Sequence, residues 1–113
     1  MAQAERIDRV FRALSDPTRR RVVEQLTLHP ASVSELAQPF DMALPSFMLH
    51  LRVLEEAGVV RSKKRGRVRT FELQPERLRG AERWLCRQRE LWERRLDQLD
   101  AYVLALKQKE KEP

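Results

Sequence analysis

Residue types that usually perform catalysis or bind metals are scarce in this sequence of 113 residues. It contains two histidines, one cysteine and one tyrosine. A metal cage needs several His, Cys or carboxylate ligands, and a catalytic nucleophile needs a base beside it. His29 and His50 lie on different segments, and Cys86 has no second cysteine to pair with. We therefore expect no enzyme activity, no cofactor and no metal site.

Basic residues, in contrast, are concentrated in one short stretch. The chain has 23 Lys and Arg against 17 Asp and Glu, a formal net charge of +6. Residues 61–69 contain six of these cations and no acid, and the rest of the chain is balanced in charge. Such a patch suits a polyanion, because local potential rather than total charge binds phosphates and displaces counterions. A solvated charged loop is the alternative that composition alone allows.

Length and composition predict one small helix-rich domain. Hydrophobic residues make up 42% and charged residues 35% of the chain, which suffices for a single core. No apolar run approaches the roughly 18 residues of a membrane span, and the N-terminus carries acids instead of an apolar signal segment. With a single cysteine, this pattern predicts a cytoplasmic protein without a membrane partner.

Four helices are expected before the basic stretch. Asp16 and Pro17 mark the start of the second helix, because Asp accepts an unpaired amide and Pro needs no amide hydrogen. Ser32 and Glu35 have the spacing of a capping box at the start of the third. Gly58 is suited to end the fourth in the left-handed conformation. The expected helices cover residues 4–15, 17–29, 33–40 and 44–57.

The fourth helix has one face for the core and one for a ligand. A wheel at about 100° per residue groups one set of large apolar side chains as its core face: Leu44, Phe47, Leu51 and Leu54. The opposite side carries Pro45, Ser46, Leu49, Arg52, Val53 and Glu56, with Met48 at its flank. From this face we expect the following residues to read bases in the major groove: Ser46, Met48, Leu49, Arg52 and Val53. His50 falls at the edge of the core face, where a packed or capping role and a base-reading role are both open.

The basic stretch has the pattern of a β-hairpin. Val59 and Val60 begin one strand, Val68, Thr70 and Phe71 lie in a second, and Gly66 marks the turn. The hairpin residues expected to contact DNA, through phosphates and the adjacent minor groove, are Lys63, Lys64, Arg65, Arg67 and Arg69. Arg19, Arg20 and Arg21 are either further phosphate contacts or solvated side chains.

A long helix is predicted from Pro75 onward. Its apolar residues repeat at heptad spacing, which favours pairing with a second copy, with help from the first helix. The expected dimer interface consists of Phe11, Leu14, Leu85, Trp92, Leu96, Leu99, Val103 and Leu106.

This order of elements is typical of a winged helix-turn-helix. The expected fold is mainly α with a small β-hairpin, in the order α-α-α-α-β-β-α, and dimeric through its terminal helices. Residues 1–74 are expected to form the DNA-binding part. Residues 75–113 are expected to form the dimerisation helix and a charged tail, continuous with it as one domain.

Four segments resemble the ArsR/SmtB family of bacterial transcriptional repressors, in the family's order and spacing. They are FRALSDPTRRRVVEQL (residues 11–26), SVSELA (32–37), HLRVLEEAGVV (50–60) and GRVRTFEL (66–73). The resemblance implies a homodimer that binds a palindromic operator in double-stranded DNA and blocks transcription. It does not identify an inducing ligand or partner protein.

The chain departs from the metal-sensing members of that family. Ser32 and Ser34 stand where those members carry paired cysteines, and residues 75–113 contain no histidine. Hydroxyl groups are poor ligands for soft metals. The sequence therefore resembles a subgroup without metal ligands.

A protein-interaction module that pairs through its long helix is the alternative function. The basic hairpin distinguishes the two hypotheses, since a run of cations without an acid is needed for phosphate contact and has little use in holding a protein.

Overall fold

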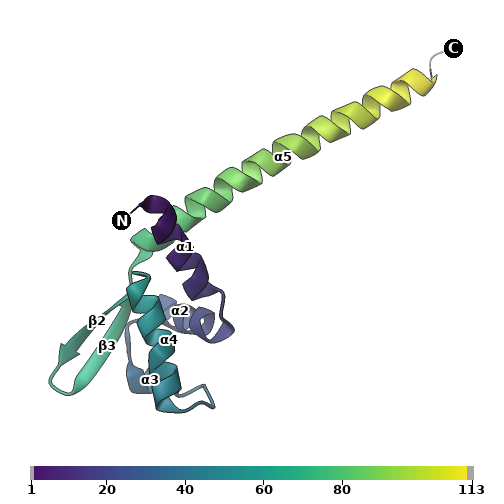
Figure 1. Cartoon of the computed structure of the whole chain (residues 1–113). Helices are drawn as coiled ribbons and strands as arrows, with labels where there is room; N and C mark the ends of the chain where they lie inside the picture. The colour runs from purple at the N-terminus through teal and green to yellow at the C-terminus, as the bar shows by residue number, and fades with distance from the viewer. Residues whose placement is uncertain (1, 112–113) are drawn as a thin grey trace. The chain divides into compact units, whose positions relative to one another are not determined.

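The computed structural model describes residues 2–111. Within that range Figure 1 shows helices, a small sheet and a long C-terminal helix. In chain order, the elements are α1 (Gln3–Leu14), α2 (Pro17–Leu28), β1 (Ala31–Ser32), α3 (Val33–Ala37), α4 (Leu44–Glu56), β2 (Val60–Arg65), β3 (Val68–Leu73) and α5 (Pro75–Lys111).

The chain divides into two compact units, residues 1–81 and residues 82–113. The first unit contains every element up to the start of α5, and the second is the rest of that helix. The sequence predicts a DNA-binding part over residues 1–74 and a dimerisation helix with a charged tail over residues 75–113. The outermost positions of these ranges lie outside the described residues, namely residues 1, 112 and 113.

Local capping signals set the helix starts as expected. Asp16 precedes α2, and its Oδ2 accepts a hydrogen bond of 3.1 Å from the Arg19 amide. At α3, the Glu35 amide donates to Ser32 Oγ at 3.3 Å, and the Ser32 amide donates to Glu35 Oε1 at 3.1 Å. The predicted capping box is confirmed. The prediction for the end of α3 was wrong, because this helix stops at Ala37 and a turn leads to Phe40.

The sheet has three antiparallel strands in the order β1-β3-β2. The hairpin of β2 and β3 is confirmed, with Gly66 at φ 60° in its turn. The sequence did not predict β1, which pairs Ala31 with Phe71 and Ser32 with Thr70. Two residues are too short for an alternating pattern, so only the pairing with β3 defines this strand.

The core of the first unit lies where α1, α2, α3 and α4 meet the sheet. Its largest fully buried side chains are Phe47, Phe71, Leu36, Leu51, Leu54, Val10, Val22, Val59 and Val60. Placing Leu44 in this core was wrong. Leu44 is the first residue of α4 and is 55% exposed, so the buried face of the helix begins only at Phe47.

Gly58 joins α4 to β2 in a conformation that favours glycine. Its φ is 77°, in the left-handed region predicted for this position. A Cβ here would also lie 2.8 Å from Arg77 Nε. Glycine therefore lets the hairpin follow α4 directly.

The second unit carries many exposed apolar side chains on one helix. They include six of the residues expected at a dimer interface, with Trp92 at 65% and Leu99 at 56% exposure. No helix among the described residues is both long enough and apolar enough to cross a membrane.

Candidate nucleic-acid interface

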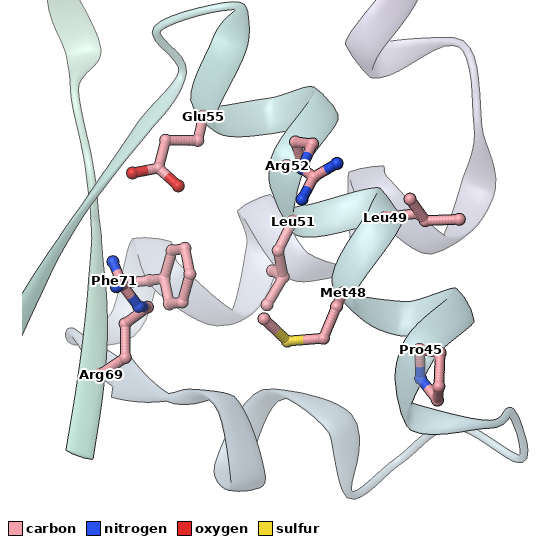
Figure 2. A pocket seen from close by; sticks show the side chains of 8 residues that line it. All are labelled: Pro45, Met48, Leu49, Leu51, Arg52, Glu55, Arg69 and Phe71. Carbon is pink, nitrogen blue, oxygen red and sulfur yellow. The ribbon is translucent and has the colours of Figure 1, made fainter. Parts of the chain in front are cut away.

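The exposed face of α4 borders a groove that β3 completes. Ser46, Met48, Leu49 and Arg52 are all exposed on this helix. The groove has a volume of about 410 Å³, and Figure 2 shows the side chains around it. Its lining residues are Pro45, Met48, Leu49, Leu51, Arg52, Glu55, Arg69 and Phe71. Three of the expected base-reading residues on α4 thus lie beside one of the expected phosphate contacts on the hairpin.

Val53 lies elsewhere on α4. It is half-buried and packs against the core, and it lines a second pocket of about 460 Å³ with Arg9 and Arg12 of α1. The structure therefore does not bring Val53 to the groove with the other expected base-reading residues.

The expected phosphate contacts of the hairpin are all exposed on β2, β3 and the turn between them. Cross-strand pairing sets Lys64 opposite Arg69 and Arg65 opposite Val68. Because side chains alternate between the faces of a sheet, Lys64 and Arg69 share the face of the buried Phe71, and Lys63 and Arg65 lie on the other face. Both faces of the hairpin consequently present positive charge.

Glu72 partly compensates that charge. It forms an ion pair with Arg61, and its Oε1 lies 3.9 Å from Lys63 Nζ. The run of cations is free of acids along the chain, but strand pairing brings in a carboxylate from 11 residues away. Among the described residues, Lys64, Arg65 and Arg67 form no ion pair, so the uncompensated charge lies near the tip of the hairpin.

The three arginines at the start of α2 have intramolecular partners, which neither interpretation of the sequence foresaw. Arg19 donates to the Ala13 carbonyl at 2.7 Å and to the Arg12 carbonyl at 3.0 Å. Arg20 donates to the Leu14 carbonyl at 2.9 Å. The bonds to Ala13 and Leu14 satisfy carbonyls at the C-terminus of α1 that have no partner within the helix, whereas the Arg12 carbonyl also accepts hydrogen bonds from the C-cap residue Ser15. The guanidinium of Arg21 lies 4.9 Å from the centre of the Phe40 ring.

His50 is held on the protein side of α4. It is half-buried, and its Nδ1 lies 3.1 Å from Arg19 Nη1 and 3.7 Å from Asp16 Oδ2. These contacts agree with the packed role and not with base reading. Burial raises the pKa of Asp16, but the hydrogen bond from the Arg19 amide and the charges of His50 and Arg19 outweigh it, so this pKa lies below its usual value.

The hydroxyl of Ser32, one of the two serines for which the family resemblance implied a loss of metal ligands, is engaged in the cap of α3. Within residues 2–111, the structure brings no three His, Cys, Asp or Glu side chains together as a metal site. The half-buried Cys86 lies on α5.

The residues expected at a dimer interface fall in both units. Phe11 and Leu14 are half-buried on α1 and pack against the core of the first unit. The others are exposed on the part of α5 that forms the second unit, namely Leu85, Trp92, Leu96, Leu99, Val103 and Leu106.

Comparison with known proteins identifies a helix-turn-helix domain over residues 14–63. An HTH-type transcriptional regulator of Mycobacterium tuberculosis is 40% identical over 68 residues, which are 60% of this chain and 64% of that protein. The chain thus spans somewhat less than two thirds of the length of this relative. The transcriptional repressor SdpR of Bacillus subtilis is 29% identical over 79 residues, 70% of this chain and 88% of that protein.

A crystal structure of an ArsR family transcriptional regulator has the same fold, with a TM-score of 0.77 and 54% sequence identity. The match covers 82% of this chain and 97% of that one. The helix-turn-helix of α3 and α4, followed at once by the hairpin of β2 and β3, is the architecture of a winged DNA-binding domain. The chain therefore belongs to the ArsR family of helix-turn-helix transcriptional regulators.

Proposed function

We propose that this regulator is a homodimeric repressor that binds a palindromic operator in double-stranded DNA and occludes a promoter. The observation that carries the proposal is the groove in which Met48, Leu49 and Arg52 of α4 lie beside Arg69 of β3. A helix that enters the major groove and a hairpin that reaches the backbone would then act as one surface. The proposal gives the chain no catalytic step.

We assign base reading to Ser46, Met48, Leu49 and Arg52. An arginine can donate two hydrogen bonds to guanine, and apolar side chains can contact thymine methyl groups. The cations Lys63, Lys64, Arg65, Arg67 and Arg69 are assigned to phosphates and the adjacent minor groove. Val53 is left out of this set, because it packs toward α1.

Dimerisation supplies the symmetry that a palindromic site requires. The exposed heptad residues of α5 are the proposed interface, with Phe11 and Leu14 of α1 in a supporting role. Repression is proposed because the Bacillus subtilis relative is named a transcriptional repressor. The site of action is proposed to be the cytoplasm.

Selection of bound sequences from a random duplex library tests the proposal. We expect two inverted half-sites whose centres are about one helical turn, or 10–10.5 base pairs, apart or a multiple of that distance. Transcription in vitro from a promoter that contains the selected site is expected to fall when the protein is added. A library without enrichment, with equal and weak binding to all duplexes, would refute the proposal and favour a protein-interaction module.

A further inference from the structure

One carboxylate lies in a groove that is otherwise suited to a polyanion. Glu55 is exposed on α4 and lines the groove with Arg52 and Arg69. A negative charge beside phosphates weakens DNA binding by electrostatic repulsion. A role for Glu55 in DNA binding therefore needs a favourable effect that outweighs this repulsion.

Two hydrogen bonds connect Glu55 to Arg69 through a serine. Ser62 Oγ donates to Glu55 Oε1 at 2.8 Å, and Arg69 Nη1 donates to Ser62 Oγ at 2.7 Å. A hydroxyl has one hydrogen to donate and lone pairs to accept, so Ser62 makes both bonds at once. Each bond has one charged partner, which makes it stronger than a bond between neutral groups. The sequence of bonds joins α4 to both strands of the hairpin.

The register of the hairpin explains why Arg69 needs this support. Lys64 lies directly opposite Arg69 on the same face of the sheet. Like charges at opposite positions repel, and a long exposed arginine otherwise samples many rotamers. The bond to Ser62 holds the guanidinium on the side of α4, where Figure 2 shows Arg69 next to Phe71.

Because Ser62 lies between Glu55 and Arg69, most N–H donors of the arginine remain free of the carboxylate. A guanidinium has five N–H donors, and the contact with Ser62 involves only Nη1. A direct two-point pair with a carboxylate would occupy two parallel donors instead. Arg69 is thereby fixed at one end while most of its donors can still bind a ligand.

We propose that Glu55 and Ser62 are positioning residues that hold Arg69 beside α4 in the conformation in which it contacts DNA. The inference rests on the proposed DNA-binding function. Ordering Arg69 before DNA arrives lowers the entropy cost of the contact, so removal of either support weakens binding although neither residue needs to touch DNA.

A double-mutant cycle of Ser62→Ala and Arg69→Ala tests the inference on the selected duplex at one fixed salt concentration. Ser62→Ala is expected to weaken binding about 2–10-fold, the cost of ordering one long side chain. In the Arg69→Ala background, the same change should have no further effect. Ser62→Thr keeps the hydroxyl and should retain affinity, whereas Ser15→Ala removes a hydroxyl outside the interface and serves as the control.

Substitutions of Glu55 separate positioning from charge. Both Glu55→Gln and Glu55→Ala remove the repulsive charge, but only glutamine keeps an acceptor for Ser62. We expect Glu55→Gln to bind at least as tightly as the wild type, and Glu55→Ala to bind more weakly than Glu55→Gln. Equal affinities for these two variants would overturn the inference.

NMR of the free protein tests, without DNA, whether Glu55 and Ser62 hold the Arg69 side chain in place. The side-chain Nε–H group of Arg69 should be ordered on the ps–ns timescale in the wild type and mobile in Ser62→Ala and Glu55→Ala. Equal mobility in all three proteins would refute the positioning role, whether or not DNA binds. Ordered Arg69 in a wild type that binds no duplex would refute the proposed function instead.

Discussion

The apolar side chains of α4 differ in burial, and therefore in how much they stabilise the free protein. Phe47, Leu51 and Leu54 are buried and stabilise the first unit. Leu49, in contrast, is 59% exposed and gains little from burial in the free protein. An exposed apolar side chain in a groove rimmed by arginines suits a thymine methyl group.

Leu49→Ala is expected to weaken binding to the selected duplex by about 1–3 kcal/mol, the range for loss of discrimination at one base pair. Binding to random duplexes and its salt dependence should not change, because leucine carries no charge. Titrations against both duplexes at the same salt concentration measure the difference. Equal losses on the two duplexes would show that Leu49 supports the helix and reads no base.

Asp16 makes the stability of the fold depend on pH in the acid range. Its pKa is lowered in the folded protein, so its stabilisation is complete above the usual pKa of about 3.9 and is lost as the pH falls through the lower, folded value. Asp16→Asn keeps an oxygen to cap α2 but has no charge. The difference in unfolding free energy between wild type and Asp16→Asn should therefore shrink as the pH falls below about 4.

Urea unfolding between pH 2.5 and pH 7 measures this difference. Asp16→Ala serves for comparison, since it also removes the cap and should cost about 0.5–2 kcal/mol at neutral pH. If the difference in unfolding free energy between wild type and Asp16→Asn stayed constant over this pH range, the lowered pKa of Asp16 in the folded protein would be contradicted.

At the scale of elements, the hairpin of β2 and β3 carries the most concentrated net positive charge. Arg65 and Arg67 flank the turn at Gly66 and form no ion pair within residues 2–111. Like Lys64, they are hairpin cations without an acidic partner among the described residues, and their counterions should be released on contact with phosphate.

Replacing Arg65 and Arg67 together by Ala is expected to flatten the dependence of log K on log salt. A dimer would lose up to about four phosphate contacts, and at about 0.9 per contact the slope falls by up to about 3.6. Replacing Lys107 and Lys109 of α5 by Ala is the control for an equal loss of charge. If the substitutions in the hairpin and in α5 changed the slope equally, the effect would come from the total charge and not from phosphate contacts of the hairpin.

Elements with strong local signals could be predicted from the sequence. Asp16, the capping box of α3 and Gly58 specify backbone conformation through neighbouring residues, and all three occur as predicted. Contacts between distant residues could not be predicted. The strand β1, the pairing of Glu72 with Arg61 and the bonds of Arg19 each depend on tertiary structure that no periodicity encodes.

The same distinction applies to the candidate site. Helical periodicity put Leu49 and Arg52 on the exposed face of α4 and Met48 at its flank, and the structure confirms that all three are exposed. It also put Val53 on that face, where the structure does not place it. Glu55 and Ser62 carry no sequence signal, since a surface carboxylate and a strand serine are common. Only the distances between their side chains reveal a connection to Arg69.

At the scale of the whole molecule, the second unit carries an exposed apolar surface that would favour association with a second copy. Trp92, Leu96, Leu99, Val103 and Leu106 are all exposed on one helix. Each large apolar side chain contributes about 1.5–3 kcal/mol when it is fully buried, so association of two copies has a substantial driving force.

Leu99→Asp is expected to convert the proposed dimer to a monomer at micromolar concentration, because it would bury an unpaired charge in the proposed dimer interface of α5. Leu104→Asp is the matched control. Leu104 is also exposed but lies about 140° around the helix from Leu99, outside the heptad stripe. Sedimentation velocity distinguishes the two states. A monomeric wild type, or a dimer that tolerates Leu99→Asp, would contradict the interface.

The strand order β1-β3-β2 leaves β2 at an edge of the sheet, with backbone groups on one side that β3 does not satisfy. Such an edge can recruit strands from other chains and start aggregation, and lysine is a common deterrent in natural sheets. Lys63, Lys64 and Arg65 occupy half of this strand. The cations proposed to bind DNA would therefore also keep the protein soluble while it is free. Neutralising all of them could remove solubility together with affinity.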